Sequence, residues 1–203
     1  MTGWSTHKGS ALALAVDNID TDQLIPARFM SVPRSEGYGR YLLHDMRRDD
    51  DEQLSAEFPL NRHEGVSILV AGHNFGSGSS REAAVYALVD AGIRAVIATS
   101  FGDIFATNAI NNGLLPARVN AEKVTQLQQA VSDVPGELSI DLTENRLTLG
   151  EITATFELDE GWRLKLINGW DDIDLTQQHY HSISAHRDKR TKTTPWAWPT
   201  KPD

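Results

Sequence analysis

One junction decides how this 203-residue chain folds: Asn74-Phe75-Gly76-Ser77-Gly78-Ser79-Ser80-Arg81-Glu82. Residues 66–71 in front of it form an apolar run with branched side chains, which is typical of a buried strand. Residues 80–91 behind it repeat apolar side chains at helical spacing, and Gly92 stands where a C-terminal cap is expected. A strand, a glycine loop and a helix in this order predict an α/β unit.

The serine at position 79 has two interpretations. Residues 79–82 fit the S-x-x-E capping box, in which a serine hydroxyl accepts a hydrogen bond from the third amide of the helix. A cap alone, however, requires neither the glycines at 72, 76 and 78 nor the adjacent Arg81. These additions are what an anion site at a helix N-terminus needs, because the helix dipole and the free amide groups favour negative charge there.

Three common glycine-loop sites do not match the junction. A nucleotide P-loop needs a lysine after its glycines, and no lysine lies between Lys8 and Lys123. A Rossmann fingerprint would place a third glycine at Arg81, and the next strand ends in Thr99 and Ser100 rather than in an acid for a ribose. The hydrolase elbow G-x-S-x-G is also missing from this stretch.

Further motifs occur in a fixed order around the glycine loop. In chain order they are Asn18–Pro26, Gly37–Leu42, Gly92–Ala98, Ser100–Phe105, Asn111–Pro116 and Leu166–Ile173. Together with residues 76–82, the set closely resembles the swivel domain of the aconitase superfamily, and within it the small subunits of 3-isopropylmalate dehydratases. The resemblance extends from about Leu12 to His179 without a break.

The resemblance implies an α/β fold, the aconitase-type swivelling β/β/α domain, with three layers, a mainly parallel sheet and an additional antiparallel sheet. Strand and helix patterns alternate three times over residues 66–131, and two strand hairpins are expected over residues 137–143 and 147–158, with a turn at Glu144-Asn145. We predict a single domain over residues 1–187, followed by a Pro- and Trp-containing tail over residues 188–203.

The same resemblance implies the small subunit of a heteromeric hydro-lyase that interconverts 2-isopropylmalate and 3-isopropylmalate through 2-isopropylmaleate, in leucine biosynthesis. By position, Ser79 is the catalytic base that removes a proton α to a carboxylate, and Arg81 binds a substrate carboxylate. Asp22 is assigned an orienting role in the catalytic group, although an Asx turn before Pro26 explains it equally well. The predicted substrate-binding residues are Gly78, Ser80, Arg28 and Arg34.

The chain contains no cysteine, which excludes thiolate chemistry of its own. Enzymes of this superfamily use a [4Fe–4S] cluster held by cysteine thiolates, so the cluster is expected on a large partner subunit and no metal is expected on this chain. His179, His181 and His186 are interpreted as surface residues. The absence of cysteine fits a cytoplasmic protein, and the chain has no apolar run long enough for a membrane span. The net charge of −9 argues against nucleic acid as a partner.

The chain departs from the family pattern beside the glycine loop. Ala83 replaces the usual histidine, Val85 and Tyr86 replace a proline and a tryptophan, and Ser31-Val32 replaces a basic pair in the loop associated with the substrate's variable group. Two alternatives therefore stay open. Beside the isopropylmalate enzyme, the first alternative is the small subunit of a sister hydro-lyase for a homoaconitate- or methylmalate-type substrate, and the second is a non-catalytic relative.

Overall fold

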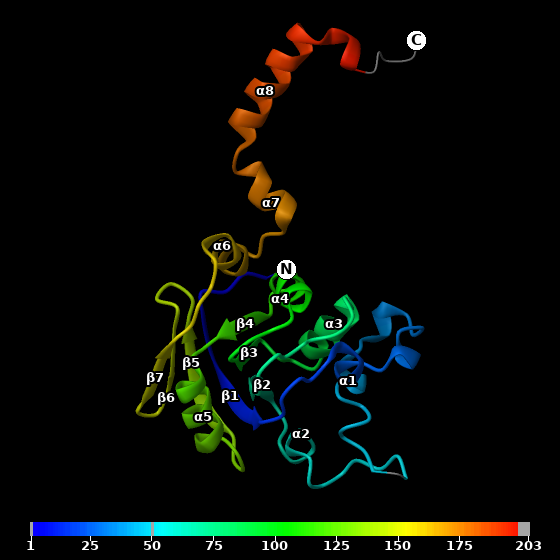
Figure 1. Cartoon of the computed structure of the whole chain (residues 1–203), viewed down its shortest axis with the longest axis vertical. Helices are drawn as coiled ribbons and strands as arrows, with labels where there is room; N and C mark the ends of the chain where they lie inside the picture. Colours follow the sequence, from blue (N-terminus) through cyan, green and yellow to red (C-terminus); the bar gives the residue numbers. More distant parts are fainter. Residues whose placement is uncertain (1, 50, 199–203) are drawn as a thin grey trace.

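The computed structural model describes residues 2–49 and 51–198, and the chain folds around one mixed β-sheet (Figure 1). The sheet has seven strands in the order β4-β3-β2-β1-β5-β6-β7. The strands are β1 (Thr6–Leu14), β2 (Val66–Ala71), β3 (Ala95–Ala98), β4 (Leu115–Arg118), β5 (Gly136–Asp141), β6 (Arg146–Leu149) and β7 (Ile152–Thr155). The helices are α1 (Thr21–Leu24), α2 (Pro59–Arg62), α3 (Glu82–Asp90), α4 (Asp103–Asn111), α5 (Ala121–Ala130), α6 (Glu160–Asn168), α7 (Asp172–Gln177) and α8 (Tyr180–Thr193).

Strand β1 joins a parallel half of the sheet to an antiparallel half. It pairs in parallel with β2, and β2, β3 and β4 continue in parallel, each followed by a helix. On its other edge β1 pairs antiparallel with β5, which leads into β6 and β7. The expected α/β fold is present, and its antiparallel strands extend the same sheet instead of forming a separate one.

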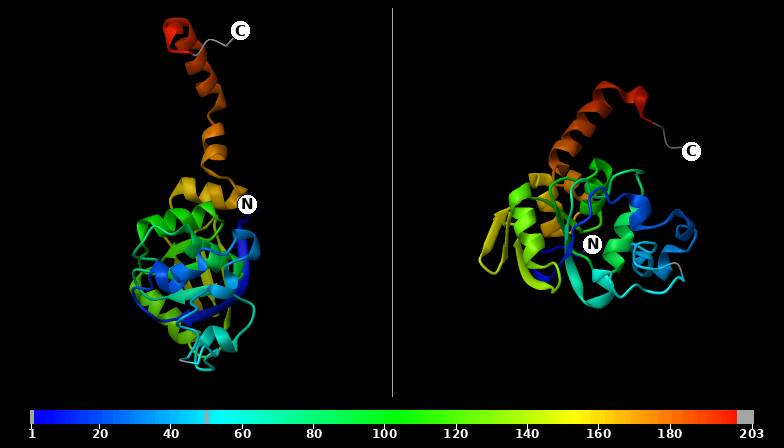
Figure 2. Two further views of the ribbon diagram at one scale, coloured as in Figure 1. Left: turned by 90° about the vertical axis from the view of Figure 1, so that its right-hand side faces the viewer. Right: turned by 60° about the horizontal axis from the view of Figure 1, so that its bottom comes forward.

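The two faces of the sheet carry separate apolar clusters. Side chains alternate along a strand, so Leu12 and Leu14 of β1 point to one face, whereas Ala11 and Ala13 point to the other. The first cluster includes buried side chains of α3 and most of those of α4, and the second includes the buried side chains of α5. Helices on both faces make three layers, which Figure 2 shows from two further directions.

Element boundaries differ from the sequence prediction mainly in β1. The apolar residues after Ala11 predict a strand over residues 12–16, but β1 begins at Thr6, because residues 6–11 pair with β5. Residues 6–10 are not apolar and are partly or fully exposed, so they carry no apolar alternation for a sequence pattern to detect. The hairpin over β5 and β6 is present as predicted, and Asn145 adopts the left-handed conformation at its turn, with φ of 48°.

The chain ends in an extended helical segment, residues 172–198, which we call the C-terminal arm. Figures 1 and 2 show α7 and α8 leaving α6 and projecting away from the sheet and its helices. Helix α8 runs without interruption through residues 187 and 188, the predicted boundary between domain and tail. That division stays a prediction, and residues 199–203 of the tail lie outside the described residues.

Candidate active site

The glycine loop is held on one side by the segment that follows β1. The amide of Gly76 donates to the carbonyl of Ile19 at 2.7 Å, and the amide of Thr21 donates to the carbonyl of Ser77 at 2.9 Å. The hydroxyl of Thr21, a buried side chain with 1% exposure, donates to the carbonyl of Ser79 at 2.9 Å. These three bonds fix the backbone immediately around Ser79, because each joins segments more than fifty residues apart.

On its other side the loop contacts the segment that follows β3. The amide of Phe75 donates to the carbonyl of Ser100, and the amide of Gly102 donates to the carbonyl of Phe75, each at 3.0 Å. Gly76 has φ of +71°, and a Cβ there would lie 2.2 Å from Cγ of Phe105. A Cβ on Gly102 would lie 2.5 Å from the carbonyl oxygen of Gly76. Both positions therefore require glycine for the close approach of backbone and ring.

Helix α3 begins later than the capping-box interpretation predicts. Its first residue is Glu82 and its N-cap is Arg81, which makes no side-chain cap bond. The capping box over residues 79–82 is therefore wrong. Gly78, with φ of +88°, turns the chain before the helix, so Ser79 and Ser80 precede the cap and are exposed. The hydroxyl of the exposed Ser79 does not cap α3 and is therefore available for another role.

Arg81 and Asp22 meet across the chain in front of the exposed serines. Nη1 of Arg81 donates to Oδ1 of Asp22, and the arginine side chain is the less exposed partner, at 23% against 53%. Asp22 lies inside α1, whereas Asp20 is the residue that caps that helix, in a capping box with Gln23. The orienting role of Asp22 thus has a contact to support it, and the local turn belongs to Asp20. Among the residues that the structure describes, Arg81 uses only Nη1 of its guanidinium, so its other donors can bind a carboxylate.

Free backbone amides complete this group. Within residues 2–49 and 51–198, the amides of Gly78, Ser79 and Ser80 donate to no backbone or side-chain acceptor, whereas Ser77 pairs with Asp20 in an isolated parallel β-bridge. They lie beside the N-terminus of α3, where the helix dipole is positive. Free amides, the Arg81 guanidinium and an exposed hydroxyl together form a surface suited to an anion.

Arg28 is held by an acidic side chain of its own loop. Nη1 and Nη2 of Arg28 donate to the two carboxylate oxygens of Asp45, and His44 also contacts Asp45 at 3.0 Å. The Arg28 guanidinium is the main reason that the pKa of Asp45 falls to about 2. The guanidinium also lies over the ring of Phe29, 4.6 Å from its centroid. Its role in substrate binding stays a prediction.

Arg34 is held at the far end of α3 from Ser79. It donates to both oxygens of Asp90, at 2.6 and 2.9 Å, and its guanidinium lies 4.4 Å from the ring centroid of Tyr86. Burial is the main reason that the pKa of Tyr86 is raised. Ala83, which replaces the family histidine, is 8% exposed and belongs to the apolar cluster under α3. The structure therefore gathers Ser79, Arg81 and Asp22, and places the two predicted binding arginines on other contacts.

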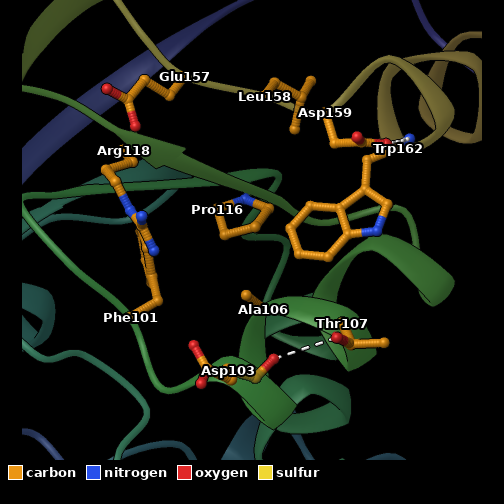
Figure 3. Close-up of a pocket in the computed structure, with 10 residues that line it drawn as sticks. All are labelled: Phe101, Asp103, Ala106, Thr107, Pro116, Arg118, Glu157, Leu158, Asp159 and Trp162. Atoms are coloured by element: carbon orange, nitrogen blue, oxygen red, sulfur yellow. Dashed lines mark hydrogen bonds between the residues drawn. The ribbon is translucent and has the colours of Figure 1, made fainter.

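A pocket of about 530 Å³, which sequence reasoning did not predict, adjoins the glycine loop (Figure 3). Phe101 and Asp103 line it from the same segment whose Gly102 contacts Gly76. Figure 3 shows Pro116 between Arg118, which extends toward Phe101, and the ring of Trp162. The remaining lining residues are Ala106, Thr107, Glu157, Leu158 and Asp159.

Thr21 and Arg118 are two residues near the loop that sequence reasoning missed. Thr21 lies inside the Asn18–Pro26 motif, so the motif offered a signal for it. Arg118 is an exposed cation immediately after the buried residues of β4, at the same sheet edge as the glycine loop. A charged residue that ends a parallel strand is the pattern that indicates it.

The described residues contain no group of three or more His, Cys, Asp or Glu side chains placed to hold a metal ion. The sequence has no cysteine, so the chain cannot supply the thiolate ligands that an iron–sulfur cluster needs. Over the part of the chain that the structure describes, no helix has the length and apolar character needed to cross a membrane.

Comparisons with known proteins agree with this architecture. The family model "Aconitase C-terminal domain" matches residues 1–122. The 3-isopropylmalate dehydratase small subunit of Shewanella sp. (strain ANA-3) is 47% identical, covering 92% of this chain and 96% of its own length. That of Shouchella clausii is 42% identical, covering 91% and 95%. The solved structure of 3-isopropylmalate dehydratase (LeuD) from Methanocaldococcus jannaschii is 29% identical, with a TM-score of 0.66 over 89% of this chain and 99% of that chain.

Proposed function

Because the chain belongs to the family of 3-isopropylmalate dehydratase small subunits, in the aconitase superfamily, we propose that it supplies half of the active site that interconverts 2-isopropylmalate and 3-isopropylmalate. The reaction proceeds by dehydration to 2-isopropylmaleate and rehydration, as a step of leucine biosynthesis. One observation carries the proposal: Ser79 is exposed and lies two residues before Arg81, whose guanidinium is paired with Asp22 at the N-terminus of α3.

Ser79 is the proposed base, and its Oγ takes the proton from the carbon α to a substrate carboxylate. A serine hydroxyl is a very weak acid, so its deprotonated form needs strong local stabilisation. The free amides of residues 78–80, the positive end of α3 and the Arg81 guanidinium can provide it, since they are fixed in place before the reaction begins. The proton moves between Ser79 Oγ and the substrate carbon in both directions of the isomerisation.

Arg81 binds a substrate carboxylate through its planar fork and so fixes the reacting carbon against Ser79. Asp22 positions Arg81, because it holds one edge of the guanidinium. Gly78 and Ser80 offer backbone amides to the same carboxylate. Arg28 is now paired with Asp45, and Arg34 with Asp90. Each arginine binds the substrate by exchanging that carboxylate for one of the substrate, which requires the loop over residues 27–41 to move.

The chain works with a large subunit, which carries the [4Fe–4S] cluster in this proposal. The cysteine-free sequence supports that assignment, since the cluster needs thiolates that only a partner can supply. When bound there, the cluster supplies a Lewis acid for the departing hydroxyl. The exposure of Ser79 and Ser80 agrees with a site that a second chain covers. We place the enzyme in the cytoplasm, with a small dicarboxylate substrate and no nucleic acid.

A sister hydro-lyase is the second candidate, favoured by one observation. Ala83 removes the family's histidine from the first turn of α3, and the alanine side chain packs into the core instead of facing the substrate. The first turn of α3 therefore lacks the polar side chain that the family pattern places there. A homoaconitate- or methylmalate-type substrate is the alternative that this change supports.

Co-expression with the large subunit, followed by anaerobic cluster reconstitution, tests the proposal. We expect kcat/KM for 2-isopropylmalate to exceed that for homoaconitate and for 2-methylmalate by at least about tenfold, because an apolar pocket distinguishes side chains of different size to this extent. Equal or faster turnover of another substrate would support the sister enzyme. A loaded complex that turns over none of the three would contradict both candidates.

A further inference from the structure

The C-terminal arm has almost no contact with the rest of the chain. No residue of α7 or α8 is buried, and among described residues α8 makes its substantial helix contacts only with the 3-10 turn Pro195–Ala197 behind it. Figures 1 and 2 show the arm projecting from α6 in every view. A helix without a buried side lacks the tertiary packing that normally stabilises helices in proteins.

The root of the arm, in contrast, is fixed. Lys165 of α6 is 2% exposed, and its Nζ donates to Asp172 at 2.6 Å and to Asn111 at 2.5 Å. Asp171 caps α7 in a capping box with Asp174. These bonds set the direction in which the arm leaves the body, so the arm is presented in a defined orientation.

The arm leaves the body at the amino ends of the parallel strands, whereas the glycine loop lies at their carboxyl ends. Trp4, just before β1, donates from its amide to the carbonyl of Leu166 at 3.0 Å and from Nε1 to the carbonyl of Gly113 at 3.3 Å. Gly113 lies just before β4, so the end of α6 sits at the amino ends of the parallel strands. The glycine loop follows the carboxyl end of β2. One large partner can therefore contact the chain at two separate edges.

The sequence of α8 is a poor intrinsic helix former. Residues 180–186 are Tyr-His-Ser-Ile-Ser-Ala-His, most of which have lower helix propensity than alanine or leucine. At 14 residues the helix is also near the length below which isolated helices are marginal in water, about 12–15 residues. Its formation therefore calls for a surface to pack on.

The side chains of the arm indicate what kind of surface it binds. Tyr180 and Ile183 share one side of α8 and are 60% and 44% exposed, and Trp196 is 83% exposed. Residues 180–193 contain four arginines or lysines and one aspartate, a charge of +3, in a chain of charge −9. The remainder of the chain thus carries −12. A basic helix with exposed aromatic side chains fits an acidic groove that also offers apolar contacts.

From these features we infer that the C-terminal arm docks in an acidic, partly apolar groove of the large subunit. The inference rests on the proposed function, which supplies the large subunit as partner. A second copy of the chain, whose remainder of charge −12 is also acidic, is the alternative occupant, and the test below distinguishes it from the large subunit. The arm then anchors the small subunit from the edge opposite the catalytic loop, and the loop is left to face the partner's half of the site.

The test measures the affinity of the full chain for the cluster-bearing large subunit by isothermal titration calorimetry, at low and at high salt. Ile183→Asp changes the arm, and Val134→Asp, at a 70% exposed apolar residue of the α5–β5 loop, is the matched control. We expect Ile183→Asp to weaken binding at least about tenfold, as for a buried interface residue. Val134→Asp should change it less than about twofold, and both variants should unfold at the same temperature as the wild type.

Equal binding by the Ile183 variant and the wild type would overturn the inference. So would a wild-type chain that dimerises alone in sedimentation velocity through a contact that Ile183→Asp removes, because the arm would then belong to a second copy. Turnover is measured separately on the same complexes. A complex that binds through the arm but converts no isopropylmalate would refute the proposed function while leaving the arm in place.

Discussion

Gly76→Ala is the substitution that tests most sharply how the loop is built. The new Cβ would lie 2.2 Å from Cγ of Phe105, and Phe105 is itself 3% exposed in the core, so the ring has little room to move. The substitution also places a side chain at φ of +71°. Gly65 has the same φ of +71°, and a Cβ added there would meet no atom within 4 Å, so Gly65→Ala reports the backbone strain alone.

We expect Gly65→Ala to lower the free energy of unfolding by about 1 kcal/mol, the cost of a left-handed alanine. Gly76→Ala adds an overpacking cost of about 1–3 kcal/mol, which gives a total of about 2–4 kcal/mol. Urea denaturation of both variants measures the difference. Phe105→Ala should cost less in the Gly76→Ala background than alone, by at least about 1 kcal/mol, because the two side chains compete for one space. Equal stability of the two glycine variants would refute the close contact.

Three further predictions concern the surroundings of the loop. Thr21→Val leaves the carbonyl of Ser79 without its buried donor and should lower the free energy of unfolding by about 1–2 kcal/mol, measured by urea denaturation. Thr21→Ser keeps a hydroxyl and should lower it less, so equal losses would argue against this bond. Asp22→Asn should lower kcat/KM of the complex about 10- to 100-fold by releasing Arg81, with stability unchanged within about 0.5 kcal/mol; unchanged kinetics would remove the positioning role. The pKa of Asp45 is lowered from 3.8 to about 2, so its ion pair stabilises the fold above pH 4 and is lost as pH falls toward 2. The pair is half exposed, so wild type should lose at most about 1 kcal/mol more than Asp45→Asn over that range in denaturation titrations, and equal losses would contradict the role of the pair.

The strand, glycine loop and helix around residues 74–82 could be predicted from sequence because all three signals are local. The capping box could not be judged in the same way. Whether Ser79 or Arg81 caps α3 depends on the turn at Gly78, and its φ of +88° is not encoded in an S-x-x-E pattern. A glycine just before a predicted cap is thus a reason to doubt where the helix begins.

Contacts between distant segments account for the rest of what sequence reasoning missed. Asp22 and Arg81 are 59 positions apart, and Arg34 and Asp90 are 56 apart, so no spacing rule connects either pair. The family pattern placed Asp22 near the loop, but only the fold shows that Asp22 holds Arg81. It likewise shows that Arg34 is held by Asp90, at the end of α3 away from Ser79.

The central claim is that Ser79 is the base of a divided active site, and its removal tests the claim most directly. Isomerisation of 2-isopropylmalate is measured with the reconstituted complex of wild type, Ser79→Ala and the neighbouring control Ser80→Ala. Because Ser79 is exposed and caps no helix, the substitution should change stability by less than about 0.5 kcal/mol. We predict that Ser79→Ala lowers kcat about 10²- to 10⁴-fold, the usual contribution of a general base, with the complex intact and Ser80→Ala far less affected. Turnover by Ser79→Ala within a few-fold of wild type would contradict the assignment.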